Sequence, residues 1–179
     1  MGCNSEWEKL PPASEKKADE WRLTVSRSGP LKGGEFDLND TPDLLPVMAA
    51  VACFARGDTA LVNVAHARIK ETDRIAAMAE ELAKLGVSTS ELPDGLIIHG
   101  KGGIPAVDCR DANAAAKPSA HAAANAGRHP KTDSRMDHRI AMALAAAALG
   151  SPQAVEIAGA ECARVTYPHF MELLGADLV

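Results

Sequence analysis

The stretch His66-Ala-Arg-Ile-Lys-Glu-Thr-Asp-Arg-Ile-Ala-Ala-Met78 marks the point at which a strand gives way to a helix. Apolar residues from Ile75 to Leu85 recur with the spacing of one helical face. Thr72 or Asp73 stands where a helix is capped, and Gly86 stands where a left-handed glycine ends one. The stretch therefore predicts one amphipathic helix with a defined start and a defined end.

Two basic residues, Lys70 and Arg74, crowd the start of this helix. A helix N-terminus already carries a partial positive charge, so each cation placed there costs about 0.3–1 kcal/mol. The same charges on a helix N-terminus hold an anion well. The pattern therefore indicates an anion-binding site at this end of the helix.

The motif around this helix start recurs along the chain. Asp73-Arg-Ile-Ala-Ala-Met-Ala79 is echoed by Asp137-His-Arg-Ile-Ala-Met-Ala143, and more weakly by Asp43-Leu-Leu-Pro-Val-Met-Ala49. For any single copy, a capping aspartate followed by core residues is an equally good interpretation. Two copies with arginine in the first turn favour an internal repeat, whose units present helix N-termini to one site.

The order of expected elements predicts an α/β (α+β layered) fold, because strand patterns alternate with helix patterns. Residues 1–20 are polar and are expected to form an N-terminal segment outside the domain that spans 21–179. Within that domain, the alanine-rich stretch 106–135 is expected to be a low-complexity insertion. Strands are expected at 21–25, 60–65, 87–91, 96–99, 154–158 and 177–179, and helices at 43–55, 70–85, 137–149 and 167–174.

Composition excludes several classes of function. A net charge of −5 and a pI of about 5.7 give no support to a nucleic-acid partner. No apolar run is long enough for a transmembrane helix, so no membrane role is expected. His121 and His129 are expected to be solvated loop residues, and no metal or cofactor is predicted. The cysteines lack disulfide or metal-ligand spacing and fit reduced thiols in a cytoplasmic protein; they are Cys3, Cys53, Cys109 and Cys162.

Four segments together resemble 5-enolpyruvylshikimate-3-phosphate synthase (3-phosphoshikimate 1-carboxyvinyltransferase). They occur in that family's order, span about residues 20–179, and match only the C-terminal part of such enzymes. The resemblance implies repeated βαβαββ-type units of the enolpyruvyl transferase C-terminal domain, incomplete in this chain. The segments are Gly34-Glu-Phe-Asp-Leu-Asn-Asp-Thr-Pro-Asp43, Arg68-Ile-Lys-Glu-Thr-Asp-Arg74, Asp137-His-Arg-Ile-Ala-Met142 and Thr166-Tyr-Pro-His-Phe170.

The reaction that this resemblance implies transfers the enolpyruvyl group of phosphoenolpyruvate to a hydroxyl of shikimate 3-phosphate and releases phosphate. It belongs to aromatic amino-acid biosynthesis, and the family is the target of glyphosate. By resemblance, Asp43 is the base toward the hydroxyl, Lys70 shares that proton transfer, and Glu71 protonates the methylene carbon. Arg74 and Arg139 match the arginines that bind phosphoenolpyruvate.

Residue patterns alone leave alternatives for several of these positions. Asp43 is equally suited to capping a helix after Pro42, and Lys70 with Glu71 equally suits a surface ion pair worth under about 1 kcal/mol. His138 either tunes the site or caps the helix at its own position. The resemblance also places His66 where the family has an asparagine on the shikimate phosphate.

One position departs from the family pattern. Before Thr166 many family members have a lysine that binds phosphoenolpyruvate, and this chain has Val165 there with Arg164 beside it. Adjacent residues face different sides of an element, so Arg164 is an incomplete substitute. We therefore expect weaker binding of phosphoenolpyruvate.

The absent N-terminal half leaves three functional hypotheses. The chain is an enolpyruvyl transferase in its own right, one half of a split enzyme that needs an N-terminal-half polypeptide, or a non-catalytic remnant that binds these anions. Apolar surface that longer relatives bury makes self-association a further expectation.

Overall fold

The computed structural model describes residues 3–10, 21–107 and 129–175. Residues 32–101 contain one complete βαβαββ unit, whose strands form a sheet in the order β3-β4-β6-β5. β3 and β4 are parallel, whereas β6 is antiparallel to both β4 and β5. The elements of this βαβαββ unit are β3 (Lys32–Asp37), η1 (Pro42–Leu44), α1 (Leu45–Ala52), β4 (Arg56–Val62), η2 (Ala65–Ile69), α2 (Arg74–Lys84), β5 (Thr89–Leu92) and β6 (Gly95–Lys101).

The second half of the chain contains the first part of another such unit. β7 and β8 are parallel, as β3 and β4 are, and α3 connects them. No strand among the described residues pairs with the other edge of β8. The elements are β7 (Lys131–Asp133), α3 (His138–Leu149), β8 (Glu156–Ala158), η4 (Ala160–Val165) and α4 (Phe170–Leu173).

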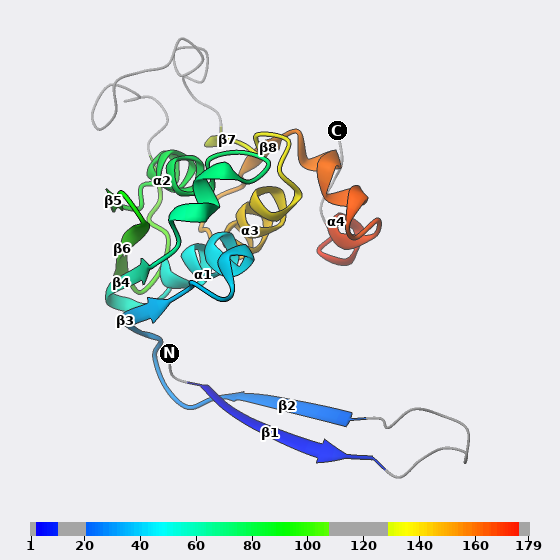
Figure 1. Ribbon diagram of the computed structural model, residues 1–179. Helices are drawn as coiled ribbons and strands as arrows, with labels where there is room; N and C mark the ends of the chain where they lie inside the picture. Colours follow the sequence, from blue (N-terminus) through cyan, green and yellow to red (C-terminus); the bar gives the residue numbers. More distant parts are fainter. Residues whose placement is uncertain (1–2, 11–20, 108–128, 176–179) are drawn as a thin grey trace.

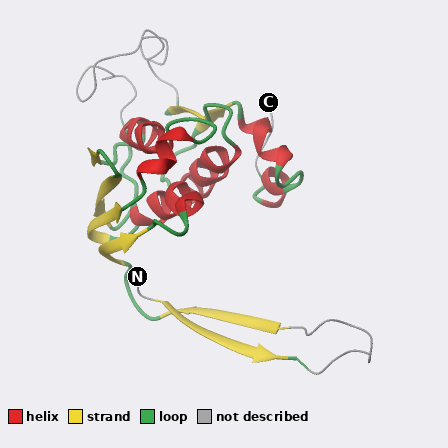
Figure 2. Ribbon diagram, viewed as in Figure 1, coloured by secondary structure: helices red, strands yellow, loops and turns green. Residues whose placement is uncertain are grey.

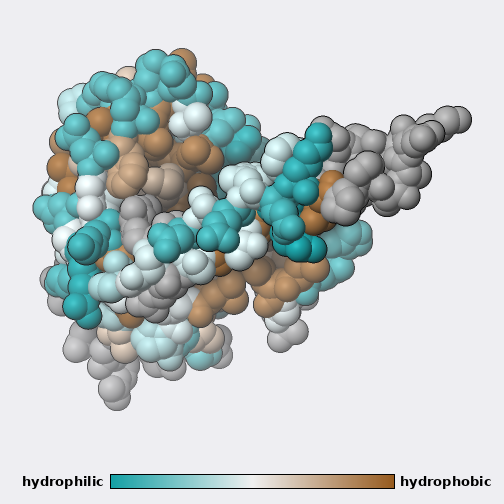
Figure 3. All heavy atoms as spheres, turned by 90° about the horizontal axis from the view of Figure 1, so that it is seen from below, coloured by the Kyte–Doolittle hydropathy of each residue, from teal (hydrophilic) through white to brown (hydrophobic). Residues whose placement is uncertain are grey.

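At the start of the chain, β1 (Cys3–Lys9) and β2 (Trp21–Arg27) form an antiparallel hairpin that extends away from the rest of the molecule (Figure 1). Residues 3–9 of the expected N-terminal segment 1–20 form β1, so a boundary at residue 20 would divide this hairpin. The strand signal of β1 is weak because polar residues occupy both faces, and Cys3 and Trp7 are the only apolar residues of this strand. Hydrophobic side chains of the hairpin lie exposed beside hydrophilic ones (Figure 3).

Helices α1 and α2 lie against one face of the four-stranded sheet, and α3 packs on them from the side away from the sheet (Figure 2). The main core fills the space between these layers. α2 contributes Ile75, Met78 and Leu82, and the strands contribute Leu61, Leu96 and Ile98, all fully buried. None of the helices in the described ranges is long and apolar enough to cross a membrane.

The ends of α2 follow from local chemistry. One carboxylate oxygen of Asp73 accepts the backbone N–H groups of Ile75 and Ala76, and Gly86 is left-handed with φ of 76°. Both features confirm the sequence prediction. The helix begins at Arg74 rather than Lys70, because η2 and an extended Lys70 precede it.

A buried carboxylate joins α2 to β7. Glu81 is fully buried and accepts hydrogen bonds from Lys84 Nζ (2.7 and 2.9 Å), from Arg135 Nη2 (2.9 Å) and from the Asp133 N–H (2.9 Å). Arg135 reaches it from a backbone with φ of 53°, a conformation that side chains rarely adopt. Within the expected insertion at 106–135, the last residues are thus ordered parts of the fold.

The remaining differences from the sequence expectations are local. β3 was missed, since its two glycines hide the strand pattern and its pairing partner β4 lies beyond a helix. The first helix was placed at 43–55, but a 3₁₀ turn covers Asp43 and α1 covers Leu45–Ala52. The expected strand at 177–179 and residues 108–128 of the expected insertion lie outside the described residues.

Gly100 allows α1 to approach the sheet, which gives a test of this packing. A Cβ at Gly100 would lie 2.4 Å from the carbonyl oxygen of Ala55 and 2.6 Å from that of Ala52, and backbone cannot move aside easily. We expect Gly100→Ala to lower the free energy of unfolding by about 1–3 kcal/mol, measured by urea denaturation with circular dichroism. Gly103→Ala, whose Cβ would meet nothing within 4 Å, is the control; equal stability of the two variants would contradict this packing.

Candidate functional site

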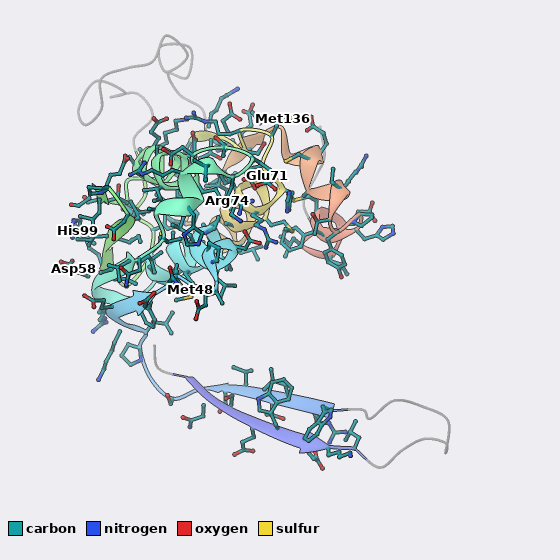
Figure 4. The ribbon with its side chains drawn as sticks, viewed as in Figure 1. Met48, Asp58, Glu71, Arg74, His99 and Met136 are labelled. Atoms are coloured by element: carbon teal, nitrogen blue, oxygen red, sulfur yellow. The ribbon has the colours of Figure 1, made fainter. Side chains whose placement is uncertain are left out.

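The starts of three helical segments converge on one cluster of charged side chains. Asp43 lies in η1, Glu71 precedes α2, and Arg74 is the first residue of α2. Asp137 and Arg139 come from the start of α3. Figure 4 shows Glu71 and Arg74 at the centre of the molecule, where α1, α2 and α3 meet. The repeated motif thus brings its units to one place, as the sequence predicted.

Arg74 is the centre of this cluster. Its side chain is 1% exposed, and three carboxylates surround its guanidinium group. Nε donates to Asp137 Oδ2 (2.7 Å), Nη1 to Asp43 Oδ1 (2.7 Å) and Nη2 to Glu71 Oε2 (2.5 Å). Desolvation opposes the charged form, but the carboxylates outweigh it and raise the pKa of Arg74 above its ordinary value. Arg74 is therefore a permanently charged group held inside the protein.

Asp137 connects two of the helices. It is fully buried, and Oδ1 accepts the Arg139 backbone N–H (2.8 Å) as the cap of α3 while Oδ2 binds Arg74. Arg135 and Met136 precede it with positive φ angles of 53° and 58°, a turn that leads the chain into this cap. The candidate site residues expected from the sequence did not include Asp137, although its repeated Asp-Arg pattern was the available signal for an inter-helix contact.

Asp43 lies among three cations. Besides Arg74, it faces Arg139 Nη2 at 3.0 Å and Lys70 Nζ at 3.7 Å. Desolvation would raise the pKa of Asp43, but the Arg74 hydrogen bond and the charges of Arg139 and Lys70 together lower it, so Asp43 is ionised at neutral pH. The capping interpretation is wrong, because neither η1 nor α1 has a side-chain cap.

Lys70 and Glu71 are neighbours that turn to different partners. Lys70 faces Asp43, whereas Glu71 binds Arg74. The alternative of an isolated surface pair between them is therefore wrong. Their side chains remain 34% and 49% exposed, so both are accessible from solvent while their charges belong to the cluster.

The other candidate residues lie outside this network of contacts. His66 in η2 and His138 at the start of α3 are half-buried, and Arg164 in η4 is exposed. None of these three side chains makes a hydrogen bond or ion pair with another residue that the structure describes. Val165 is 85% exposed. The parts of the chain described here contain no group of three or more potential metal ligands.

Comparison with known proteins gives the family of the chain. The family profile of EPSP synthase (3-phosphoshikimate 1-carboxyvinyltransferase) matches residues 6–174. The chain belongs to this family. A 3-phosphoshikimate 1-carboxyvinyltransferase of Halorubrum lacusprofundi is 42% identical over 178 residues, and one of Ruminiclostridium cellulolyticum is 46% identical over 142 residues. Structurally, an EPSP synthase of Acinetobacter baumannii aligns with a TM-score of 0.71 at 26% identity.

These matches also define what the chain shares with the family. The alignment with the H. lacusprofundi protein includes 99% of this chain but only 32% of that protein. The alignment with the R. cellulolyticum protein includes 79% of this chain and 28% of that protein. The A. baumannii structure is covered over 97% of this chain and 36% of its own. The chain thus spans about a third of an EPSP synthase. The α/β fold expected from the sequence is confirmed for that part.

The Arg74–Asp137 contact provides a prediction about stability. Asp137→Asn removes the fully buried one of the three carboxylates around Arg74 and leaves Asp43 and Glu71, so we expect a loss of about 1.5–3 kcal/mol in the free energy of unfolding. Glu80→Gln, which weakens an exposed ion pair with Arg135, is expected to cost under about 1 kcal/mol. Chemical denaturation measures both, and similar small losses would show that Asp137 does not hold Arg74 in solution.

Proposed function

We propose that this chain transfers the enolpyruvyl group of phosphoenolpyruvate to a hydroxyl of shikimate 3-phosphate, with release of phosphate. The observation that carries the proposal is the cluster in which Asp43 and Glu71 share Arg74 while Lys70 and Arg139 stand beside Asp43. A hydroxyl oxygen bonds to C2 of phosphoenolpyruvate, its proton leaves, and C3 gains a proton. Phosphate departs as C3 loses a proton again.

Asp43 and Lys70 suit the proton transfer at the hydroxyl. The pKa of Asp43 is lowered, which makes it a weak base. A weak base is sufficient here, because the hydroxyl becomes strongly acidic as its oxygen bonds to carbon. Lys70, 3.7 Å from Asp43, is placed to share this proton and to interact with the phosphorylated substrate.

Glu71 is the candidate for protonating the methylene carbon, and its carboxyl group binds Arg74. The carboxylate of phosphoenolpyruvate can replace Glu71 on Arg74, because the Glu71 side chain is half-exposed and solvent can reach it. The replacement preserves the charge balance around Arg74 and leaves the Glu71 carboxyl group able to face the methylene carbon. Arg139 would bind the phosphate of phosphoenolpyruvate.

Two alternatives concern what the rest of an EPSP synthase supplies. A split enzyme would be silent alone and would gain activity with an N-terminal-half polypeptide. A remnant would bind the two anions without turnover. Phosphoenolpyruvate and shikimate 3-phosphate are the ligands in each case, and a cytoplasmic location remains a prediction.

Phosphate release by the purified chain, given both substrates, tests the proposal. We expect release that requires both substrates and that falls by about 10²–10⁴-fold in Glu71→Gln, which keeps the shape but loses the proton donor. Asp40→Asn changes an exposed carboxylate near the cluster and should leave the rate unchanged. Absence of release from the wild-type chain would contradict the proposal, and binding measured by calorimetry would then separate the remnant from an inert protein.

Val165 gives a second prediction about the same site. Val165→Lys restores the family's basic residue at an exposed position, and we expect phosphoenolpyruvate to bind more tightly by about 1–3 kcal/mol, the value of a hydrogen bond to a charged group. His169→Lys adds a positive charge four residues away and is the control. If both variants bind phosphoenolpyruvate as the wild type does, the lysine position is not part of this site.

A further inference from the structure

The hairpin β1–β2 is a second copy of the hairpin β5–β6. Both are antiparallel, and equivalent residues stand opposite one another in the two registers. The sequence also keeps one spacing from the second strand of each hairpin onward. Leu96, Ile98, Gly102 and Ile104 correspond to Leu23, Val25, Gly29 and Leu31. The matching pairs are Ser5–Val25 with Thr89–Ile98, and Trp7–Leu23 with Glu91–Leu96.

The strand β8 is correspondingly a second copy of β4. Each is parallel to the strand before it, and Asp133 stands opposite Ala158 as Asp37 stands opposite Val62. A left-handed residue follows each strand, with φ of 58° in one case and 69° in the other. A 3₁₀ helix comes next in both. In the complete unit, however, β4 lies between β3 and β6, whereas β8 has only β7 among the described strands.

The free edge of β8 presents backbone groups that a further strand could bind. The Glu156 N–H donates to the Pro130 carbonyl, and the Ala158 carbonyl accepts from the Ser134 N–H, both on the β7 side. Alternate residues of a strand bond to opposite neighbours, so the N–H and C=O of Ile157 face the other edge. Such an edge is a template for pairing with another chain.

The hairpin has one apolar face and one polar face. On the apolar face lie Trp7, Trp21, Leu23 and Val25, which are 45–66% exposed. The other face is polar and contains the ion pair between Arg22 and Glu8. A two-stranded hairpin is at best marginally stable alone in water, and an apolar face of this kind stabilises a hairpin only when it is covered.

We propose that β2 of one copy of this chain pairs with β8 of a second copy, and so completes its sheet in the order β7-β8-β2-β1. The complete unit supplies the register. Leu61 stands opposite Leu96 there, so Leu23 of one copy lies opposite Ile157 of the other, and Thr24 lies opposite Glu156. This assembly does not depend on the enolpyruvyl transfer proposed above.

The pairing would cover what both parts expose. Leu96 and Ile98 of the complete unit are fully buried, whereas their counterparts Leu23 and Val25 are 45% and 59% exposed. On the receiving side, Ile157 is only half-buried beside a small second core. That core consists of Ala141, Ala145, Cys162, Ala163 and Met171.

Arginines at equivalent positions support the same arrangement. Arg68 in η2 donates to the carbonyls of Leu92 and Pro93 and thereby holds the β5–β6 turn. Arg164 occupies the equivalent position in η4, and it has no partner among the described residues. In the completed sheet, the turn end of the docked hairpin would lie beside Arg164.

A second copy fits better than the hairpin of the same chain. β1–β2 and β7–β8 lie at opposite ends of the molecule, with the helices between them (Figure 1). Only residues 28–31 connect β2 with β3, and four residues span at most about 14 Å. Two copies that exchange hairpins reciprocally form a closed pair, in which each apolar face is covered.

Disulfide trapping between two different variants tests the register and the partner together. Thr24→Cys is made in one preparation and Glu156→Cys in another, both with Cys3→Ser and Cys109→Ser, while the buried Cys53 and Cys162 are kept. In the proposed register Thr24 and Glu156 form a non-hydrogen-bonded pair. Antiparallel strands approach each other most closely at such pairs. We expect a disulfide-linked dimer after mixing and oxidation, and not from either variant alone.

Glu35→Cys, on the edge strand of the complete sheet, replaces Glu156→Cys in the matched control. Equal cross-linking there would show unspecific edge pairing and overturn the proposal. Absence of cross-linking in both mixtures would also overturn it.

The unmodified protein provides an independent measurement. Trp7 and Trp21 are the only tryptophans, so emission reports on the hairpin alone. Sedimentation should give twice the 18.7 kDa of one chain, with emission shifting to shorter wavelength as concentration rises. Leu23→Asp should abolish both effects, and Asn4→Asp, on the polar face of the outer strand β1, should retain the dimer. A monomer at all concentrations would overturn the proposal. This holds even if the tryptophan emission lies at short wavelength, because another part of the same chain or another polypeptide would then cover the hairpin.

Discussion

The buried guanidinium of Arg74 is the interaction on which the rest of the site depends. A charge in the interior is tolerated only when it is paired and hydrogen-bonded, and here the partners come from three distant parts of the chain, at Asp43, Glu71 and Asp137. Satisfying one cation therefore fixes the relative positions of η1, α2 and α3. The chemistry of the site and the packing of the helices are consequences of the same contact.

How far the sequence predicts this structure depends on the range of the interactions involved. The start of α2 was predictable because Asp73 caps it within three residues, and its end because Gly86 needs only its own backbone freedom. β3 and β1 were not, since strands depend on partners elsewhere in the chain. The convergence of the Asp-Arg motifs was predicted from repetition. The burial of Arg74 was not, because it depends on carboxylates up to 63 residues away.

The repeat explains why parts of this chain differ in completeness. Within residues 32–101 every strand of the unit has its neighbours, and the residues between sheet and helices are fully buried. The same elements recur as a hairpin before this unit and as a parallel strand pair after it. Their sequences still follow the pattern of the complete unit. The exposed apolar residues of the hairpin therefore occupy positions that are buried in the complete unit.

The contact between Glu81 and Arg135 offsets two unfavourable features, a buried carboxylate and a left-handed backbone at a residue other than glycine. The carboxylate is fully buried, and the arginine reaches it from a left-handed backbone that costs about 1–2 kcal/mol. Loss of the arginine leaves a buried charge with fewer donors, and loss of the glutamate leaves the strained turn with the exposed Glu80 as the arginine's remaining ion-pair partner. We therefore expect the two positions to change together in related sequences, with an uncharged acceptor such as glutamine at 81, which can still bind the Asp133 N–H, and glycine at 135.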